Sequence, residues 1–115
     1  MPRRRLYSRV LNKKCISATV DYLEDTPVQP GWILYVTTGS CEDETSAPTT
    51  MSFGKKDGNK FTPLEEDEGP TAGISKYILK THHFIAGEAP AFRFEAATLN
   101  DILRGYLEGY YEEVD

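Results

Sequence analysis

Two adjacent histidines, His82 and His83, are the residues of this 115-residue chain best suited to acid–base or metal chemistry. Side chains of neighbouring strand residues point to opposite faces, so in a strand the two imidazoles cannot serve one site. No Asp, Cys or Ser accompanies them at the spacing of a known catalytic motif. We therefore expect both histidines to be structural and the protein not to be an enzyme.

Metal and phosphate sites also find little support. The acidic run at 65–68 could bind a hard cation, but it lacks the spaced oxygen ligands and the glycine of a calcium-binding loop. Residues 54–60 lack the pattern of a phosphate-binding loop. Cys15 and Cys41 could pair in a secreted protein, yet neither has a metal-ligand spacing, and reduced thiols are expected. The sequence predicts no metal, no cofactor and a solvated acidic loop at 65–68.

Length and composition are those of one small domain. With 39% apolar residues, the chain can build one core but is too short for two ordinary domains. It has no run of about 18 apolar residues that could span a bilayer. The basic start at residues 1–5 lacks the apolar stretch of a secretory signal. We expect a soluble, unexported protein that does not span a membrane.

Charge is distributed unevenly along the chain. Residues 1–14 carry six basic residues and no acid (+6), whereas residues 15–115 carry seven basic and eighteen acidic residues (−11), which together give the net charge of −5. Such a segment can bind an acidic neighbour or a phosphate backbone, although a frayed, solvated terminus is the plainer interpretation. We interpret residues 1–14 as an extended basic arm and residues 15–115 as a single domain.

Alternating apolar residues predict that most of the domain is made of strands. We expect a half-buried strand at 15–23 and a central strand at 32–38, covered on both faces, with Trp32 buried. Residues 39–49 contain small polar and acidic residues and a proline, which is typical of a long exposed loop.

Two hairpins are also predicted. Segments 50–54 and 60–64 flank an Asp-Gly dipeptide at residues 57 and 58, and this dipeptide suits a tight hairpin turn. Farther along, an apolar strand at 74–79 runs through the histidines and a short turn into a strand where Phe92 and Phe94 alternate with polar residues.

The last segment has a different period. Between residues 99 and 114 the apolar residues recur at spacings of three and four, with one adjacent pair in each turn, which predicts an α-helix capped by Thr98. Gly105 and Gly109 each cost about 1 kcal/mol in a helix interior. The predicted fold class is mainly β: a small β-barrel or β-sandwich with an extended basic N-terminal arm and one C-terminal α-helix at about 99–114.

The order of elements over about residues 50–97 resembles that of the head-decoration, or cement, proteins of tailed bacteriophages. The shared order is a strand (61–64), an acidic glycine-containing loop (65–73), a strand that begins near Ile74, a glycine-containing turn and a Phe-x-Phe-like strand (92–94). This resemblance implies a virion structural protein, made in the host cytoplasm and placed on the capsid surface. It implies the major capsid protein as partner and a homotrimer or other homo-oligomer on the shell, which bridges and stabilises coat subunits.

Candidate partner-binding residues come from the arm and from the tyrosines of the predicted helix. They are Arg3, Arg4, Arg5, Leu6, Tyr7, Arg9, Val10, Leu11, Tyr106, Tyr110 and Tyr111. Nucleic-acid binding through the arm is an alternative, although the acidic domain would repel phosphates. A small acidic inhibitor or adaptor protein is another.

Overall fold

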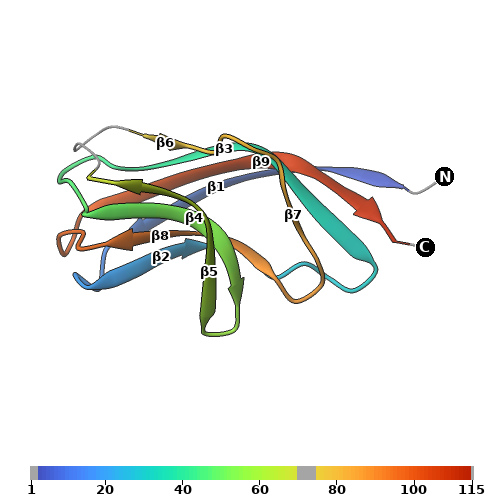
Figure 1. Ribbon diagram of the computed structural model, residues 1–115, viewed down its shortest axis with the longest axis horizontal. Coiled ribbons are helices and arrows are strands. Elements are labelled where there is room, and N and C mark those ends of the chain that lie inside the picture. Colours follow the sequence, from blue (N-terminus) through green and yellow to red (C-terminus); the bar gives the residue numbers. More distant parts are fainter. Residues whose placement is uncertain (1–2, 70–74, 115) are drawn as a thin grey trace.

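The computed structural model describes residues 3–69 and 75–114, and its strands form two antiparallel sheets (Figure 1). The strands are β1 (Arg4–Lys14), β2 (Val20–Glu24), β3 (Trp32–Asp43), β4 (Thr50–Asp57), β5 (Lys60–Glu68), β6 (Lys76–Tyr77), β7 (His82–Phe84), β8 (Ala89–Glu95) and β9 (Ile102–Glu113). The described residues contain no helix, and therefore none that could cross a membrane. The sheets do not close into a barrel.

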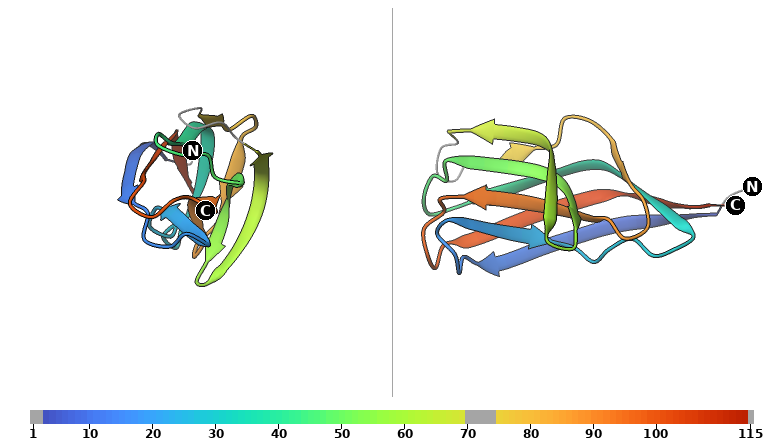
Figure 2. Two further views of the ribbon diagram at one scale, coloured as in Figure 1. Left: turned by 90° about the vertical axis from the view of Figure 1, so that its left-hand side faces the viewer. Right: turned by 60° about the horizontal axis from the view of Figure 1, so that its bottom comes forward.

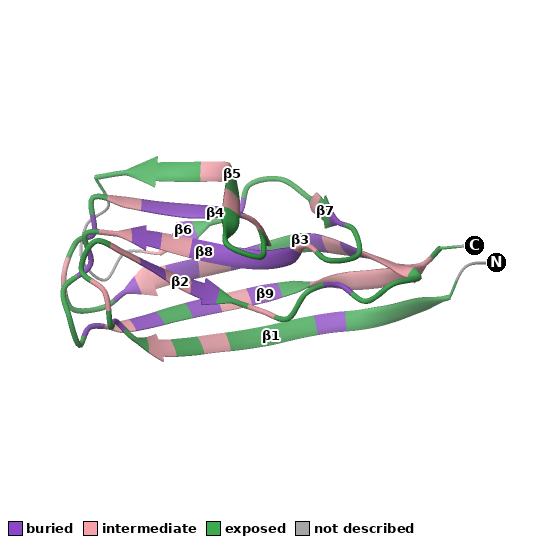
Figure 3. Ribbon diagram, turned by 90° about the horizontal axis from the view of Figure 1, so that it is seen from below, coloured by how far each residue is buried: buried purple, intermediate pink, exposed green. Residues whose placement is uncertain are grey.

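One sheet, which we call the long sheet, has the order β1-β9-β3-β6, with β7 also paired to β3. The other, the short sheet, has the order β2-β8-β4-β5. Apolar side chains from both sheets fill the space between them, and this core is rich in aromatic rings. Its largest fully buried members include Tyr7, Phe53, Phe84, Phe92 and Phe94. Figure 3 marks the buried residues along the strands of both sheets.

The long sheet extends beyond the short one. Strands β1, β3 and β9 continue toward the end of the molecule where both termini lie, and no strand of the short sheet follows them there (Figure 2). The molecule is accordingly elongated, with extents of 46 × 24 × 20 Å. Trp32, predicted to be buried, lies in this projecting part and is only half-buried.

The prediction of an extended N-terminal arm is wrong. Residues 4–14 form β1, which pairs with β9 along its whole length, from Arg4 opposite Glu112 to Lys14 opposite Ile102. Apolar anchoring explains the difference, because Tyr7 points into the core and is 1% exposed. Pairing an 11-residue strand also satisfies backbone groups that a free arm would leave to water.

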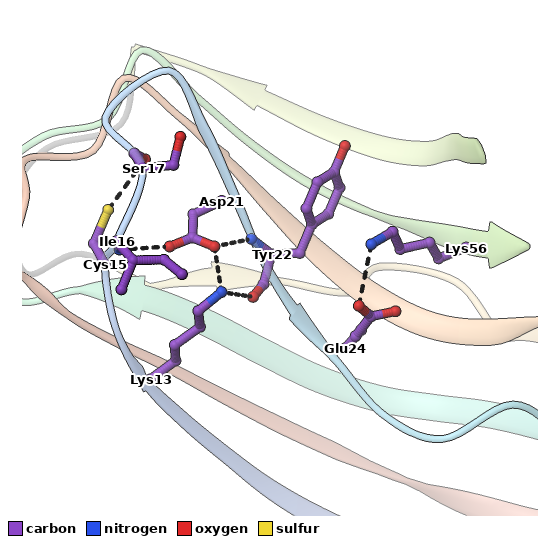
Figure 4. A network of polar contacts seen from close by, with 8 residues as sticks. All are labelled: Lys13, Cys15, Ile16, Ser17, Asp21, Tyr22, Glu24 and Lys56. Carbon is purple, nitrogen blue, oxygen red and sulfur yellow. Dashed lines mark hydrogen bonds and ion pairs between the residues drawn. The ribbon is translucent and has the colours of Figure 1, made fainter. Parts of the chain in front are cut away.

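The basic residues of this segment are largely neutralised within the chain. Ion pairs join Arg3 to Glu113, Arg4 to Glu112, Arg9 to Asp25 and Lys13 to Asp21. Figure 4 shows the last of these: the buried Asp21 carboxylate accepts hydrogen bonds from Lys13 and from the backbone N–H groups of Ile16 and Tyr22. Burial alone would raise the pKa of Asp21, but these donors outweigh it and hold the pKa below its ordinary value.

The C-terminal helix is absent, and residues 102–113 form β9, the strand between β1 and β3. Leu103, Leu107 and Tyr111 face the core at a spacing of four, which fits two strand repeats as well as about one helical turn. Gly109 favours the strand. A Cβ at this position would lie 1.8 Å from the carbonyl oxygen of Tyr35, so only glycine allows β3 and β9 to approach this closely.

Of the two predicted hairpins, the first is confirmed. Strands β4 and β5 pair around a turn in which Gly58 has φ +61°. The second hairpin is wrong, because the chain passes from one sheet to the other between its two strands: β7 pairs with β3, whereas β8 pairs with β2 and β4. The predicted alternation in β8 does hold, since Phe92 and Phe94 are fully buried.

Two further boundaries differ from the prediction. The strand expected at 15–23 is β2, which begins only at Val20, and Ile16 is 73% exposed. The loop expected at 39–49 is strand as far as Asp43, because β3 stays paired with β9 to that residue.

Strand β3 is central, as predicted, with β9 on one side and β6 and β7 on the other. It is not covered on both faces, because Leu34 and Val36 are buried against the short sheet while Ile33 and Tyr35 on the outer face are only half-buried.

Candidate interaction surfaces

The outer face of the long sheet, meaning the face turned away from the short sheet, exposes apolar and aromatic side chains. Leu6 is 95% exposed and Val10 is 73% exposed, both on β1. Each lies opposite a tyrosine of β9, Leu6 opposite Tyr110 and Val10 opposite Tyr106. Two large aliphatic side chains are thus exposed to solvent next to tyrosine side chains of β9.

A row of side chains crosses four strands on this face. Leu6, Tyr110, Tyr35 and His83 are successive register partners on β1, β9, β3 and β7. The rings of Tyr35 and Tyr110 are stacked, with centroids 5.0 Å apart and planes inclined by 20°. The guanidinium of Arg4 lies 4.8 Å from the centroid of Tyr110 and also pairs with Glu112 at 2.9 Å. Within the row, the Tyr35 and Tyr110 rings and the Arg4 guanidinium thus contact one another before any partner arrives.

The inner face of β1 and β9 carries other predicted partner-binding residues, and these pack within the chain. Tyr7 donates a hydrogen bond from its hydroxyl to Asp25 at 2.6 Å, and its ring meets Tyr111 edge-on at a centroid distance of 5.4 Å. Burial, together with the hydrogen bond to Asp25, raises the pKa of Tyr7 far above its ordinary value, so the phenol stays neutral. Leu11 packs against the same core.

A cavity of about 290 Å³ opens where the long sheet runs past the short one. We call it the Arg5 pocket; it is lined by Arg5, Arg9, Thr26, Pro27, Gln29, Trp32 and Tyr111. The guanidinium of Arg5 lies 5.0 Å from the Trp32 ring centroid, and Trp32 meets Tyr111 edge-on at 6.3 Å. The pocket combines positive charge with aromatic walls.

The acidic run at 65–68, predicted as a solvated loop, is the end of β5, and its first member is partly buried. The Glu65 carboxylate accepts hydrogen bonds from the backbone N–H of Leu79 at 2.8 Å and of Lys80 at 3.3 Å. It also contacts His82. Glu66 pairs with Arg93 at 3.1 Å. Glu66, Asp67 and Glu68 are all exposed, and of these three only Glu66 forms an ion pair among the described residues.

The histidine pair is split between the two faces of the long sheet, as predicted. His82 faces the core, where its ring lies 5.7 Å from that of Phe53, and His83 lies outside, 6.3 Å from Tyr35. Cys15 and Cys41 are both buried and unpaired. Among residues 3–69 and 75–114, no group of three or more potential metal ligands is close enough to hold an ion.

The predicted partner-binding residues thus fall on two surfaces. The outer face holds Arg4, Leu6, Val10, Tyr106 and Tyr110, and the inner face holds Arg3, Arg5, Tyr7, Arg9, Leu11 and Tyr111.

Sequence reasoning missed Tyr35 and His83 on the outer face, and Trp32 and Gln29 in the pocket. Alternation along β3 could have placed Tyr35 on the face opposite Leu34 and Val36, but not beside His83, which is a long-range partner. No local signal relates residues 26–29 to Arg5.

No family model and no curated protein sequence matches this chain. Among solved structures it is similar to a Bacillus endospore appendage protein, described as forming "a novel family of disulfide-linked pili", at a TM-score of 0.59 and 12% identity over 100% of this chain and 92% of the other. It is also aligned with a protein of infectious bursal disease virus, Gx strain, at a TM-score of 0.33 and 8% identity, covering 97% of this chain and 42% of the other. At these identities the first likeness shows the fold alone, and the second carries no argument.

Proposed function

We propose that this protein is a non-enzymatic structural subunit that assembles into a repetitive protein array. The outer face of the long sheet carries the proposal, because it leaves Leu6 and Val10 exposed at 95% and 73% beside the stacked rings of Tyr35 and Tyr110. A large exposed apolar patch on a soluble protein is often a contact site for another molecule. Tyrosine adds contact area at a low cost in conformational entropy.

The free edge of the long sheet supports the same function. Within the described part of the chain, β1 pairs only with β9, so one side of an 11-residue strand offers its backbone groups to another molecule. Strand addition to such an edge is a common mode of protein association. The edge is held firmly, because the register with β9 is continuous from Arg4 to Lys14.

The finer form of the proposal is decoration of a phage capsid. In this form, homo-oligomers on the virion surface contact the major capsid protein through the outer face of β1 and bridge neighbouring coat subunits. Many weak contacts on a lattice would give firm attachment. The resemblance of the sequence pattern over residues 50–97 to head-decoration proteins favours this form, although residues 65–68 of that pattern lie in β5 and not in a loop.

A fibre subunit is the second form. It is favoured by the likeness to the endospore appendage protein, which extends over 100% of this chain. The disulfide linkage named for that protein is not carried over, since Cys15 and Cys41 are each 1% exposed.

Nucleic-acid binding through β1 has less support. Ion pairs within the chain occupy Arg3, Arg4, Arg9 and Lys13, four of the six basic residues of the segment. Neutralised side chains release fewer counterions on contact with phosphates, so the electrostatic term is small.

Sedimentation velocity over a concentration series tests the proposal. The wild-type chain should associate, and the double variant Leu6→Thr/Val10→Thr should need about tenfold higher concentration to do so, because it loses apolar contact area while both new residues are β-branched and suit a strand. Thr62→Ser, an exposed position on β5 of the short sheet and away from this face, is the control and should behave as wild type. A wild-type chain that stays monomeric throughout would reject the proposal.

A further inference from the structure

The Arg5 pocket carries one positive charge that the chain does not balance. Arg9 at its rim is paired with Asp25 at 3.3 Å, and Arg3 nearby is paired with Glu113. Among residues 3–69 and 75–114, no carboxylate lies within ion-pair distance of Arg5, which instead stacks over Trp32 at 5.0 Å. Arg5 is exposed and its guanidinium is oriented by the Trp32 ring, so it can pair with a carboxylate or another anion from outside the chain.

The remaining lining residues favour a small acidic side chain in an extended segment. Thr26 and Gln29 supply polar groups, while Pro27, Trp32 and Tyr111 supply apolar walls. A volume of about 290 Å³ suits one or two side chains and is small for a folded element.

Unbalanced negative charge gathers at the opposite end of the molecule. Asp67 and Glu68 end β5, are exposed, and have no ion-pair partner among the described residues. The two acids before them, Glu65 and Glu66, are occupied by contacts within the chain. Figure 1 places this end of β5 away from the termini, while the Arg5 pocket lies on the part of β1, β3 and β9 that leads to them.

We propose that the Arg5 pocket binds Asp67 and Glu68 of a second copy of this chain. The proposal rests on the proposed function, assembly with copies, and names one contact of that assembly. A contact between different surfaces at opposite ends does not close on itself as a two-fold dimer does; repeated, it gives a head-to-tail row. Charge complementarity sets the direction of the row.

Trp32 is the only tryptophan of the chain and lines the pocket, so its fluorescence reports on occupancy. The probe is an amidated and acetylated peptide of residues 64–69, titrated into dilute full-length protein. We expect a saturable change in Trp32 emission, weakened about tenfold or more by Arg5→Gln and unchanged by Lys14→Gln, which removes an exposed charge at the other end of β1. A peptide carrying Asp67→Asn and Glu68→Gln should fail to bind.

Three results of the titration would overturn the proposal: no response, an equal response in Arg5→Gln, or an equal response to the substituted peptide. A response to a short oligothymidylate but not to the peptide would overturn it as well and assign the pocket to nucleic acid.

Charge reversal tests the same contact during assembly. Arg5→Glu alone and Asp67→Lys/Glu68→Arg alone should each lose head-to-tail association, whereas an equal mixture should regain it, since every junction then joins opposite charges. Variants that each assemble as wild type would overturn the pocket contact and leave the proposed function standing. If the wild-type chain never assembles, the proposed function fails, and the peptide titration still decides whether the pocket binds this segment.

Discussion

The carboxylate of Glu65 lies 2.6 Å from Nε2 of His82. The contact joins β5 of the short sheet to β7 of the long sheet, and Glu65 also receives the backbone N–H groups of Leu79 and Lys80. Both side chains are largely buried, with 10% and 15% of their surface exposed. This carboxylate therefore holds the segment that leads into β7. Its role is to stabilise the fold, and it does not contribute to an exposed acidic surface.

Replacing Glu65 with Gln should lower the free energy of unfolding by about 1–3 kcal/mol, because a neutral amide cannot accept all of these hydrogen bonds. Urea denaturation measures the change. Glu68→Gln, at an exposed position of the same strand, is the control and should stay within about 0.5 kcal/mol of wild type. Equal stability of the two variants would contradict the role of Glu65.

The stability difference between wild type and Glu65→Gln should also depend on pH. Burial alone would raise the pKa of Glu65, but the hydrogen bonds from Leu79, His82 and Lys80 outweigh it and hold the pKa below its ordinary value of 4.5. A carboxylate with a lowered folded-state pKa stabilises fully above its unfolded pKa and loses this contribution as pH falls through the folded value. The difference should therefore shrink between about pH 6 and about pH 3. A difference that stays constant or grows would show that the charge of Glu65 is not what stabilises the fold.

Gly109→Ala should be strongly destabilising. The added Cβ would lie 1.8 Å from the carbonyl oxygen of Tyr35 and 3.0 Å from the Cα of Val36, so β3 and β9 would have to separate. We expect a loss of about 3 kcal/mol or more, or no folded protein. Thermal unfolding followed by circular dichroism checks this. A melting temperature within a few degrees of wild type would show that the two strands are not in contact at this point.

Both thiols should be unreactive in the folded protein. Cys15 and Cys41 are each 1% exposed, and burial raises the pKa of both thiols, so neither forms the reactive thiolate at neutral pH. A thiol reagent such as Ellman's should react slowly with native protein and titrate two thiols after denaturation. Rapid native labelling of either cysteine would contradict this burial.

Part of the fold could be predicted from local pattern. The β4–β5 hairpin follows from the Asp57-Gly58 turn, and the buried face of β8 follows from its alternation. The helix prediction failed because Leu103, Leu107 and Tyr111 fit both periods, and the choice was decided by a long-range contact at Gly109. The local sequence of a segment does not show which distant strand it will pair with.

The candidate surfaces were predictable to a similar degree. Basic and aromatic residues of β1 and β9 were identified, but not the distinction between the inward Tyr7 and the outward Leu6, which depends on β1 being a strand. The ion pairs that neutralise Arg4 and Arg9 join residues 108 and 16 positions apart in the chain. No rule based on sequence spacing predicts an ion pair between residues so far apart in the chain.

Electron microscopy of concentrated wild-type protein tests the central claim most directly. The account predicts ordered assemblies, in which head-to-tail rows repeat at up to the 46 Å length of the molecule. It also predicts that Arg5→Glu abolishes the rows and that Leu6→Thr/Val10→Thr raises the concentration at which assemblies form. Isolated monomers at every concentration, without a lattice or fibre, would contradict the claim that this protein is a structural subunit built to associate with its own copies.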